Sequence, residues 1–345
     1  MEIAAQDRDR SRSKKRMVLL ALATMSGAIA VYLALPLPAT PIAAGRQVTI
    51  AMPTIANGAL MLVAAGQGLF QKVGVDVAIQ PFELGKDALK SVLDGKSNLA
   101  VVGDTPFMFA LLGGADIATL ASISQSRRAL AIIARGDRGI QNVQDLKGKS
   151  VGVTQGTNLT YFLDAMLQVH GVASDAVIQS DLRTDAGISA FKSGQIDAVV
   201  LFQPHIAKLQ SEMGDRIKVM YGEDVYAFRF LLVGKPSYIE SHPQEVRTVL
   251  RALVAAQQSI RADPVEARRT IGIALKTDDA MVARLFQPED YTVLLDEAML
   301  LALDDETRWA IKKGLVESRP MPNYLNFIKY QDLEAVLPTA VTVVH

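Results

Sequence analysis

The sequence predicts an α/β protein of two similar lobes, each built on a mostly parallel sheet with helices on both faces. Its 345 residues are 50% apolar and 21% charged, which is enough to bury a sizeable core and form two folding units. From residue 47 onward, apolar strand-like runs alternate with stretches of helical spacing, as expected for parallel strands joined by crossover helices. Part of this pattern recurs about 100 residues later, which indicates a second, similar lobe.

The first 45 residues predict a segment that takes the protein out of the cytoplasm. A basic cluster ends at Arg16, residues 17–35 carry no charge, and Pro36, Pro38 and Pro41 then stop any helix. A cleaved signal peptide and an uncleaved N-terminal membrane anchor both fit residues 1–45. In either case we expect the body of the protein to face an extracytoplasmic space, with any membrane contact made through this segment.

Composition excludes several classes of protein. The chain has 36 Lys and Arg against 36 Asp and Glu, and no basic face that would indicate nucleic-acid binding. It has no cysteine, which removes disulfides, thiolate metal sites and cysteine nucleophiles. The four histidines lack metal-ligand spacing. We therefore expect no metal, no cofactor and no nucleic-acid partner.

The elements of the first half follow from hydrophobic periodicity. Strands are expected at 48–52, 75–82, 98–103, 115–123 and 129–135, and helical stretches at 59–69, 85–93 and 107–112. The second half repeats this order approximately. Residues 93–106 match 192–204 at an offset of 99, which pairs Gly95 with Gly194 and Asn98 with Asp197. Chance matching of generic units is the alternative, but a second matching pair, 47–70 with 149–172, follows the same order.

Residues 147–158 predict a strand, a tight turn and the start of a helix. Gly156 can adopt a positive φ, and Thr157 or Asn158 can cap the helix that runs over 159–169. The free N–H groups of a first helical turn bind anions well, although many such turns only start a helix. Ligands of open α/β sheets sit outside the carboxyl ends of strands. We therefore expect four turns, 53–57, 104–106, 154–158 and 202–204, around one cleft between the lobes.

A second apolar strand at 228–234 matches 129–135 in length, and the two are predicted to carry the chain between lobes. The expected domains are lobe 1, from 46–134 and 235–345, and lobe 2, from 135–234. Helices are expected over 241–263, 264–275, 278–286 and 292–317.

Several side chains have two interpretations. Asp104 could act as a general base or accept backbone N–H groups in its turn, and Asp185 could cap a helix or contact a ligand. Arg127, Arg128 and Arg229 are either solvated or an anion clamp. Four aromatic residues could line an apolar pocket or only pack: Phe107, Tyr161, Phe202 and Phe228.

The runs 98–123, 129–167 and 187–205 resemble the solute-binding proteins of ABC importers for nitrate, sulfonates and taurine, and their thiamine-precursor-binding relatives. The resemblance implies a type II periplasmic-binding-protein fold with a hinge of two crossover strands. Such a protein is not an enzyme. It captures a small anionic or polar organic solute in the interlobe cleft, in the periplasm or on the outer face of the inner membrane, and delivers it to an ABC permease. We expect a monomer.

The same resemblance implies a set of ligand-binding residues: Thr54, Asn57, Thr105, Gln125, Gly156, Thr157, Asn158, Asp185 and Gln203. Many relatives have Trp followed by an acid before proline where this chain has Phe202, Gln203 and Pro204. The loss of that acid argues against an amine-bearing ligand such as taurine. Two alternatives remain. One is a lyase or decarboxylase on the same fold, with Asp104, Asp185 or Tyr161 as acid or base, and the other is a membrane-anchored sensory input domain.

Overall fold

The computed structural model describes residues 47–317 and 320–344. The signal-peptide and membrane-anchor predictions for residues 1–45 lie outside this range. Within the described residues, none of the helices has the length and apolar character needed to cross a membrane. Arg46–His345 forms one compact unit, which contains both sheets.

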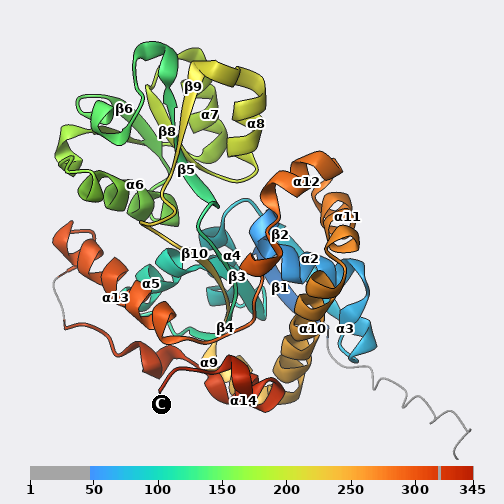
Figure 1. Cartoon of the computed structure of the whole chain (residues 1–345). Coiled ribbons are helices and arrows are strands. Elements are labelled where there is room, and N and C mark those ends of the chain that lie inside the picture. The colour runs from blue at the N-terminus through green and yellow to red at the C-terminus, as the bar shows by residue number, and fades with distance from the viewer. Residues whose placement is uncertain (1–46, 318–319, 345) are drawn as a thin grey trace, which may run out of the picture. The chain divides into compact units, whose positions relative to one another are not determined.

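The first sheet has five strands in the order β2-β1-β3-β10-β4 (Figure 1). Its strands are β1 (Val48–Pro53), β2 (Val77–Phe82), β3 (Leu99–Gly103), β4 (Ala118–Ser126) and β10 (Phe228–Gly234). Strand β1 is parallel to β2 and β3, whereas β10 is antiparallel to both of its neighbours. Four strands therefore run in one direction and β10 runs in the other.

The second sheet repeats this topology in the order β7-β6-β8-β5-β9. Its strands are β5 (Leu130–Arg135), β6 (Ser150–Val153), β7 (Ile178–Asp181), β8 (Ala198–Phe202) and β9 (Ile217–Tyr221). Here β5 is the strand of opposite direction, antiparallel to β8 and β9. Both sheets are thus mixed, with strand direction mostly shared, and the reversed strand in each is one of the two predicted crossover strands.

The chain passes between the sheets earlier than the expected lobe boundaries at 134 and 234. It leaves the first sheet after Ser126 and enters the second at Leu130. It leaves the second sheet after Tyr221 and re-enters the first at Phe228. Each crossover strand is hydrogen-bonded on both edges within the sheet that it enters, so the crossings themselves are residues 127–129 and 222–227.

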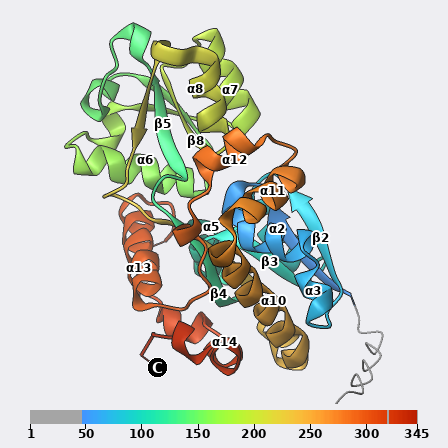
Figure 2. The same cartoon turned by 45° about the vertical axis from the view of Figure 1, so that its right-hand side comes forward.

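Helices cover both faces of each sheet (Figures 1 and 2). The second sheet packs against α6 (Asn158–Val169), α7 (Thr184–Ser193) and α8 (His205–Met213). The first lobe holds α2 (Ala59–Gly66), α3 (Leu69–Lys72), α4 (Gly85–Leu93), α5 (Asp104–Leu112), α9 (Pro236–Ser241), α10 (Pro243–Ala262), α11 (Pro264–Leu275), α12 (Asp279–Leu285), α13 (Glu297–Lys312) and α14 (Tyr330–Val336). Helix α13 reaches toward α6 of the second lobe (Figure 1).

The internal repeat extends to individual hydrogen bonds. In the first lobe, Asn98 Oδ1 accepts from both the backbone N–H and the hydroxyl of Thr49, each at 2.8 Å. In the second lobe, Asp197 Oδ2 accepts from the same two groups of Ser150, at 3.0 and 2.8 Å. These contacts fix β1 beside β3 and β6 beside β8, because each joins the start of one strand to the residue that directly precedes its parallel neighbour.

Candidate functional site

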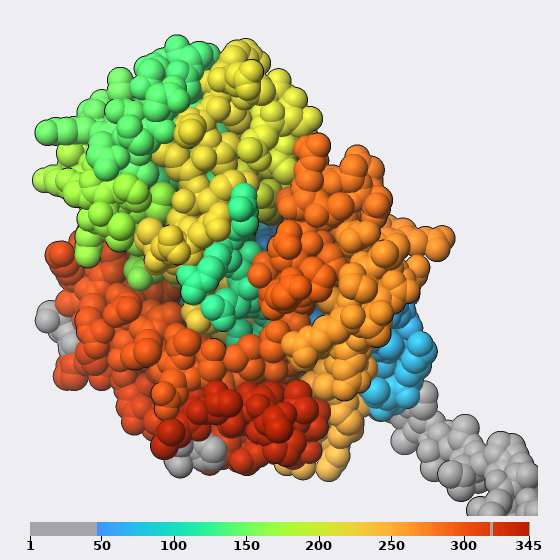
Figure 3. Space-filling model, in the orientation of Figure 1, coloured from blue at the N-terminus to red at the C-terminus, as the bar shows by residue number. Residues whose placement is uncertain are grey.

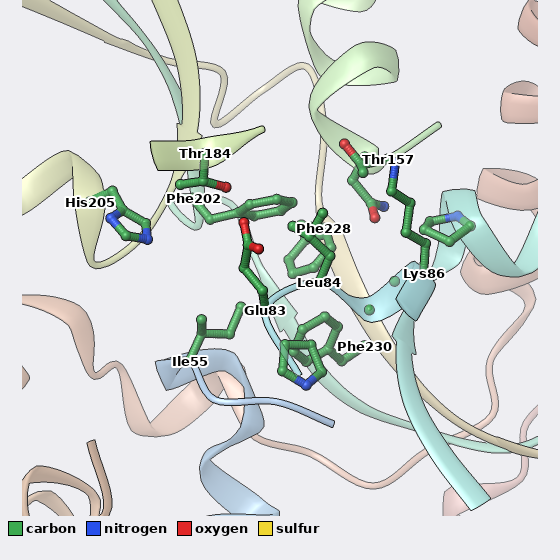
Figure 4. A pocket seen from close by; sticks show the side chains of 15 residues that line it. Ile55, Glu83, Leu84, Lys86, Thr157, Thr184, Phe202, His205, Phe228 and Phe230 are labelled. Atoms are coloured by element: carbon green, nitrogen blue, oxygen red, sulfur yellow. The ribbon is translucent and has the colours of Figure 1, made fainter. Parts of the chain in front are cut away.

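The two lobes enclose a pocket with mainly apolar walls (Figure 4), which we call the apolar pocket. It spans about 520 Å³, counting the part that is open to solvent. Its lining consists of Pro53, Ile55, Glu83, Leu84, Gly85, Lys86, Gly103, Pro106, Thr157, Asn158, Thr184, Phe202, His205, Phe228 and Phe230. All four predicted turns contribute to this lining, as expected where the carboxyl ends of parallel strands from two sheets face each other.

Three phenylalanine rings form a continuous wall of the apolar pocket. Phe228 and Phe230 are two residues apart on β10, so their side chains lie on the same face of the strand, with ring centroids 4.9 Å apart. Phe202, at the end of β8, brings a third ring from the second lobe, 5.6 Å from Phe228. Phe228 and Phe230 are almost fully buried, whereas Phe202 is half-buried.

Polar groups lie at the two ends of this wall. Figure 4 shows Lys86 and Thr157 at one end and His205 at the other, with the three phenylalanines between them. Lys86 Nζ donates to the Gln155 carbonyl at 2.8 Å, which links α4 of the first lobe to the turn before α6. Within residues 47–317 and 320–344, Lys86 forms no ion pair. Its charge is therefore available to an anion in the pocket.

The rest of the pocket lining is closer to neutral. Glu83 Oε2 lies 2.6 Å from Arg183 Nη2, so this carboxylate is paired across the lobes. Burial lowers the pKa of His205, so its imidazole is uncharged near neutral pH. Among the described residues, no group of three or more His, Asp or Glu is placed to hold a metal ion.

The turn before α6 is built as the sequence predicts. Gly156 has φ +69°, a left-handed conformation that favours glycine. Thr157 is the N-cap of α6, and its hydroxyl accepts from the Leu159 N–H. The first turn of α6, with its partial positive charge, therefore faces the same end of the pocket as Lys86.

Behind the pocket lies a buried network that joins both lobes and a crossing segment. Asn158 Nδ2 lies within hydrogen-bond distance of Asp104 Oδ1, Thr105 Oγ1 at 3.0 Å and the Tyr226 hydroxyl at 2.6 Å. Tyr226 OH lies 2.5 Å from Asp104 Oδ1 and 3.2 Å from Glu306 Oε1, so its single proton serves one carboxylate at a time. We call Asp104, Thr105, Asn158, Tyr226 and Glu306 the buried network.

The two carboxyl groups of the buried network have shifted pKa values. Burial raises the pKa of Asp104 to about 6, against hydrogen bonds and the nearby charge of Arg229 that lower it. Burial and the charge of Asp104 raise the pKa of Glu306 well above its usual value. Asp104 Oδ2 and Glu306 Oε2 are both buried and find no hydrogen-bond partner among the residues that the structure describes. The two groups therefore bind a proton more readily than exposed carboxyls do.

Gly103 allows the lobes to approach each other at this point. A Cβ built on Gly103 would overlap Asn158 Oδ1 and lie 3.0 Å from Phe228 Cε2. Asn158 cannot swing away without breaking its hydrogen bonds to the buried network. The absence of a side chain at residue 103 is therefore a requirement of the closed arrangement.

The single tryptophan also bridges the lobes. Trp309, on α13, donates from Nε1 to Asp164 Oδ2 on α6 at 2.9 Å, and Lys313 Nζ lies 3.1 Å from the same oxygen. Its ring packs edge-on against Tyr161, with centroids 5.2 Å apart. Trp309 therefore packs at the contact between the two lobes.

A second interlobe hollow is more polar, and we call it the polar hollow. It opens beside the crossing segments, between the segment that ends β9 and the segment that follows α12 (Figure 3). Its lining consists of Asn57, Ser126, Arg128, Ala129, Gln203, Tyr221, Arg284, Leu285, Gln287, Asp290 and Tyr291. Arg128 stacks on the Tyr221 ring at 4.5 Å and pairs with Glu223 at 2.8 Å, so much of its charge is already used.

The nine expected ligand-binding residues occupy four kinds of place. Thr157 and Asn158 line the apolar pocket, and Asn57 and Gln203 line the polar hollow. Thr105 is fully buried in the buried network. The remaining four lie outside the lining of both hollows: Thr54, Gly156 and Asp185, which are exposed, and Gln125, which is half-buried.

Several lining residues had no sequence-based prediction. Lys86 lies in the first turn of α4, and Glu83 and Leu84 belong to the turn after β2, which the four expected turns did not include. That turn also follows a parallel strand, so the rule that placed the other four applies to it. Phe202 and Phe228 line the pocket, as one interpretation of them held, whereas Phe107 and Tyr161 do not.

Comparison with known proteins gives one family match. Residues 55–267 match the family model described as NMT1/THI5 like. The taurine-binding periplasmic protein of Escherichia coli K12 is 25% identical over 225 residues, which cover 63% of this chain and 67% of that protein.

Two solved structures show the same fold. The alkanesulfonate-binding protein SsuA of Xanthomonas axonopodis pv. citri, solved with bound MOPS, aligns with a TM-score of 0.73 at 19% identity, over 83% of this chain and 99% of that one. The desulfurization enzyme DszB aligns with a TM-score of 0.67 at 15% identity, over 86% and 99%. With the two sheets described above, these alignments show the two-lobed periplasmic-binding-protein fold. The fold therefore carries both binding proteins and an enzyme.

Proposed function

The chain belongs to the NMT1/THI5-like family, and on that basis we propose that it is a solute-binding protein of an ABC importer. It captures a small anionic organic solute between its lobes and delivers it to a membrane permease. The observation that carries the proposal is the apolar pocket, whose lining comes from the strand ends of both sheets. A site divided between two lobes exists only while they are closed, so ligand binding and closure are coupled.

The lobes are expected to move as two bodies about the crossings at 127–129 and 222–227. Only these two segments join the sheets along the chain, and hinges are typically a few residues between elements. The residues expected to bind the anionic group are Lys86, Thr157 and Asn158, which supply positive charge and hydrogen-bond donors at one end of the pocket. Since both lobes contribute, the bound solute holds the closed form.

The expected location is extracytoplasmic, and the expected partner is an ABC permease. The basic and then apolar start of the sequence supports export, and the similarity to a taurine-binding periplasmic protein supports the same compartment. Delivery to a permease requires a monomer with both lobes accessible, so we propose that the protein acts as a monomer, either free or held by its N-terminal segment.

Binding without catalysis is the better supported activity. An enzyme on this fold would need an acid or base among Asp104, Asp185 and Tyr161. None of them lines the apolar pocket: Asp104 lies behind it in the buried network, Asp185 is exposed, and Tyr161 packs on Trp309. General acid–base catalysis requires the group within hydrogen-bond reach of the substrate.

Native mass spectrometry and titration calorimetry test the proposal. The purified protein is expected to carry, or to bind on addition, one small anion per chain from a panel of nitrate, alkanesulfonates, arenesulfonates and carboxylates. The bound compound should be recovered chemically unchanged. A protein that takes up none of these compounds, or one that converts a bound compound into a product, would contradict it.

A further inference from the structure

We propose that the solute is an aromatic monoanion, an arenesulfonate or arenecarboxylate, whose ring lies against the phenylalanine wall of the apolar pocket. This inference rests on the proposed function and specifies its ligand. It excludes nitrate, short alkanesulfonates and taurine as the preferred ligands. Three features of the pocket carry it: the aromatic wall, the single cation at one end and the paired carboxylate of Glu83 beside the wall.

The wall matches a flat apolar body. Phe202 and Phe228 meet at an interplanar angle of 53°, and Phe228 and Phe230 at 66°. Of the three rings, the half-buried Phe202 keeps open surface for a further ring, which aromatic pairs prefer at centroid separations of about 4.5–7 Å. Leu84 and Ile55 add aliphatic surface to the lining. A nitrate ion or a two-carbon sulfonate would leave most of this apolar surface in contact with trapped water.

One residue of the wall differs from a packed core residue. Phe228 and Phe230 are buried by the protein itself, at 1% and 2% exposure. Phe202 is only half-buried although the lobes are closed, and it lines the pocket. Its remaining apolar surface is the part that a ligand ring would cover.

The charged residues of the pocket favour a ligand that carries a single negative charge and binds in one orientation. Lys86 and the first turn of α6 lie together and favour an anionic head group there. Farther from Lys86, beside the phenylalanine rings, Glu83 would repel a second anionic group. It is already paired with Arg183 at 2.6 Å, which makes it a poor partner for a ligand ammonium. A zwitterion such as taurine is therefore recognised at its sulfonate only.

Titration calorimetry with matched probes tests the inference. Benzenesulfonate, ethanesulfonate and taurine share one head group and differ in the body that meets the wall, and nitrate lacks an organic body. We expect benzenesulfonate to bind at least about tenfold more tightly than ethanesulfonate or taurine. Trp309 fluorescence provides a second signal, because its indole bridges the lobes.

Two variants separate the wall from the head-group site. Phe202→Leu keeps an apolar, half-buried residue without the ring, and should reduce the preference for benzenesulfonate over ethanesulfonate to about threefold or less. Phe327→Leu makes the same change at a half-buried position outside the pocket, and should leave the preference intact. Lys86→Met should weaken both sulfonates by a similar factor, because both use the same head group.

The outcomes distinguish this inference from the proposed function. If ethanesulfonate, taurine or nitrate binds as tightly as benzenesulfonate, or if Phe202→Leu leaves the preference unchanged, the aromatic ligand class is wrong and solute binding stands. If none of the four probes binds and the purified protein carries no anion, both are wrong.

Discussion

Two sets of contacts hold the lobes together, and they differ in burial. The buried network joins Asn158 of the second lobe to Asp104 and Glu306 of the first, and all three side chains are at most 2% exposed. The rim contacts join Arg183 of the second lobe to Glu83 and Asp87 of the first, at 2.6 and 3.1 Å, and the Arg183 side chain is 53% exposed. The rim contacts are exposed ion pairs, whereas the buried network consists of hydrogen bonds to carboxyl groups that are shielded from water.

This difference in burial separates contacts that break at little cost from contacts that the closed form requires. An exposed ion pair is screened by salt and contributes about 0–1 kcal/mol, so the rim can open and close at little cost. A buried network must be complete, because each carboxylate that loses a donor is left desolvated. The rim therefore guides closure, whereas the buried network and Gly103 determine whether the closed form exists.

The largest expected effect comes from placing a side chain between the lobes. Gly103→Ala puts a Cβ into Asn158, which is held by hydrogen bonds, and so should prevent full closure. We expect ligand affinity to fall by about 100-fold or more, about 3 kcal/mol, while each lobe stays folded. Calorimetry and circular dichroism measure the two quantities. The control is Gly113→Ala, which also lacks a positive φ and lies away from the pocket. Unchanged affinity in Gly103→Ala would contradict the steric account.

The second effect is a pH dependence. Burial raises the pKa of Asp104 from its ordinary value of 3.8 to about 6 in the folded protein, so the folded state keeps a proton that the unfolded chain loses. The stabilisation that this proton provides is complete below about pH 4 and is lost as the pH rises through about 6. The free energy of unfolding falls by up to ~3 kcal/mol over this range. Urea unfolding at several pH values measures it. Asp104→Asn should flatten the slope, and Asp116→Asn, at an exposed position, should not. Equal slopes in the two variants would rule out this role for Asp104.

A smaller loss is expected when the network loses one hydroxyl. Tyr226→Phe removes the hydroxyl that Asp104 and Glu306 share and should lower the free energy of unfolding by about 2 kcal/mol. Asn158 and Thr105 still donate to these two carboxyl groups. Tyr324→Phe removes a hydroxyl that contacts only the neutral Thr307 hydroxyl among the described residues, and should cost about 1 kcal/mol. Chemical unfolding near neutral pH compares them. A larger loss in Tyr324→Phe would show that the buried network is not the stronger contact.

The smallest effect belongs to the rim. Arg183→Ala should change the free energy of unfolding by no more than about 0.5 kcal/mol, and high salt should remove that difference. The wild type and the variant are compared by thermal unfolding at low and high ionic strength. If the variant loses more than 2 kcal/mol of unfolding free energy and the loss persists in salt, the rim contacts stabilise the protein as strongly as the buried network does.

Most of the fold could be predicted from the sequence because it depends on local periodicity. The ranges 85–93, 228–234 and 264–275 match α4, β10 and α11 residue for residue. The lobe boundaries differed because sequence periodicity shows that β5 and β10 are strands without showing which sheet each one joins. That choice depends on neighbours far along the chain.

The site was only partly predictable. Reasoning from turns identified Thr157 and Asn158 in the pocket, because strand ends determine where a turn lies. It could not tell which hollow a side chain enters, so Asn57 and Gln203 lie in the polar hollow instead. The contact between Thr105 and Glu306 joins residues 201 apart, and no local pattern indicates such a pair.

Hydrogen–deuterium exchange with and without a saturating bound anion is the most direct test of solute capture between the lobes. Binding of a solute between the lobes predicts ligand-dependent protection on both sides of the apolar pocket at once. The protected residues are 53–57, 83–86 and 103–106 in the first lobe, and 155–158 and 202–205 in the second. Solute binding also predicts slower exchange at the crossings, 127–129 and 222–227, as the closed form is held. Protection confined to one lobe, or to the polar hollow alone, would contradict capture of a solute between the lobes in this pocket.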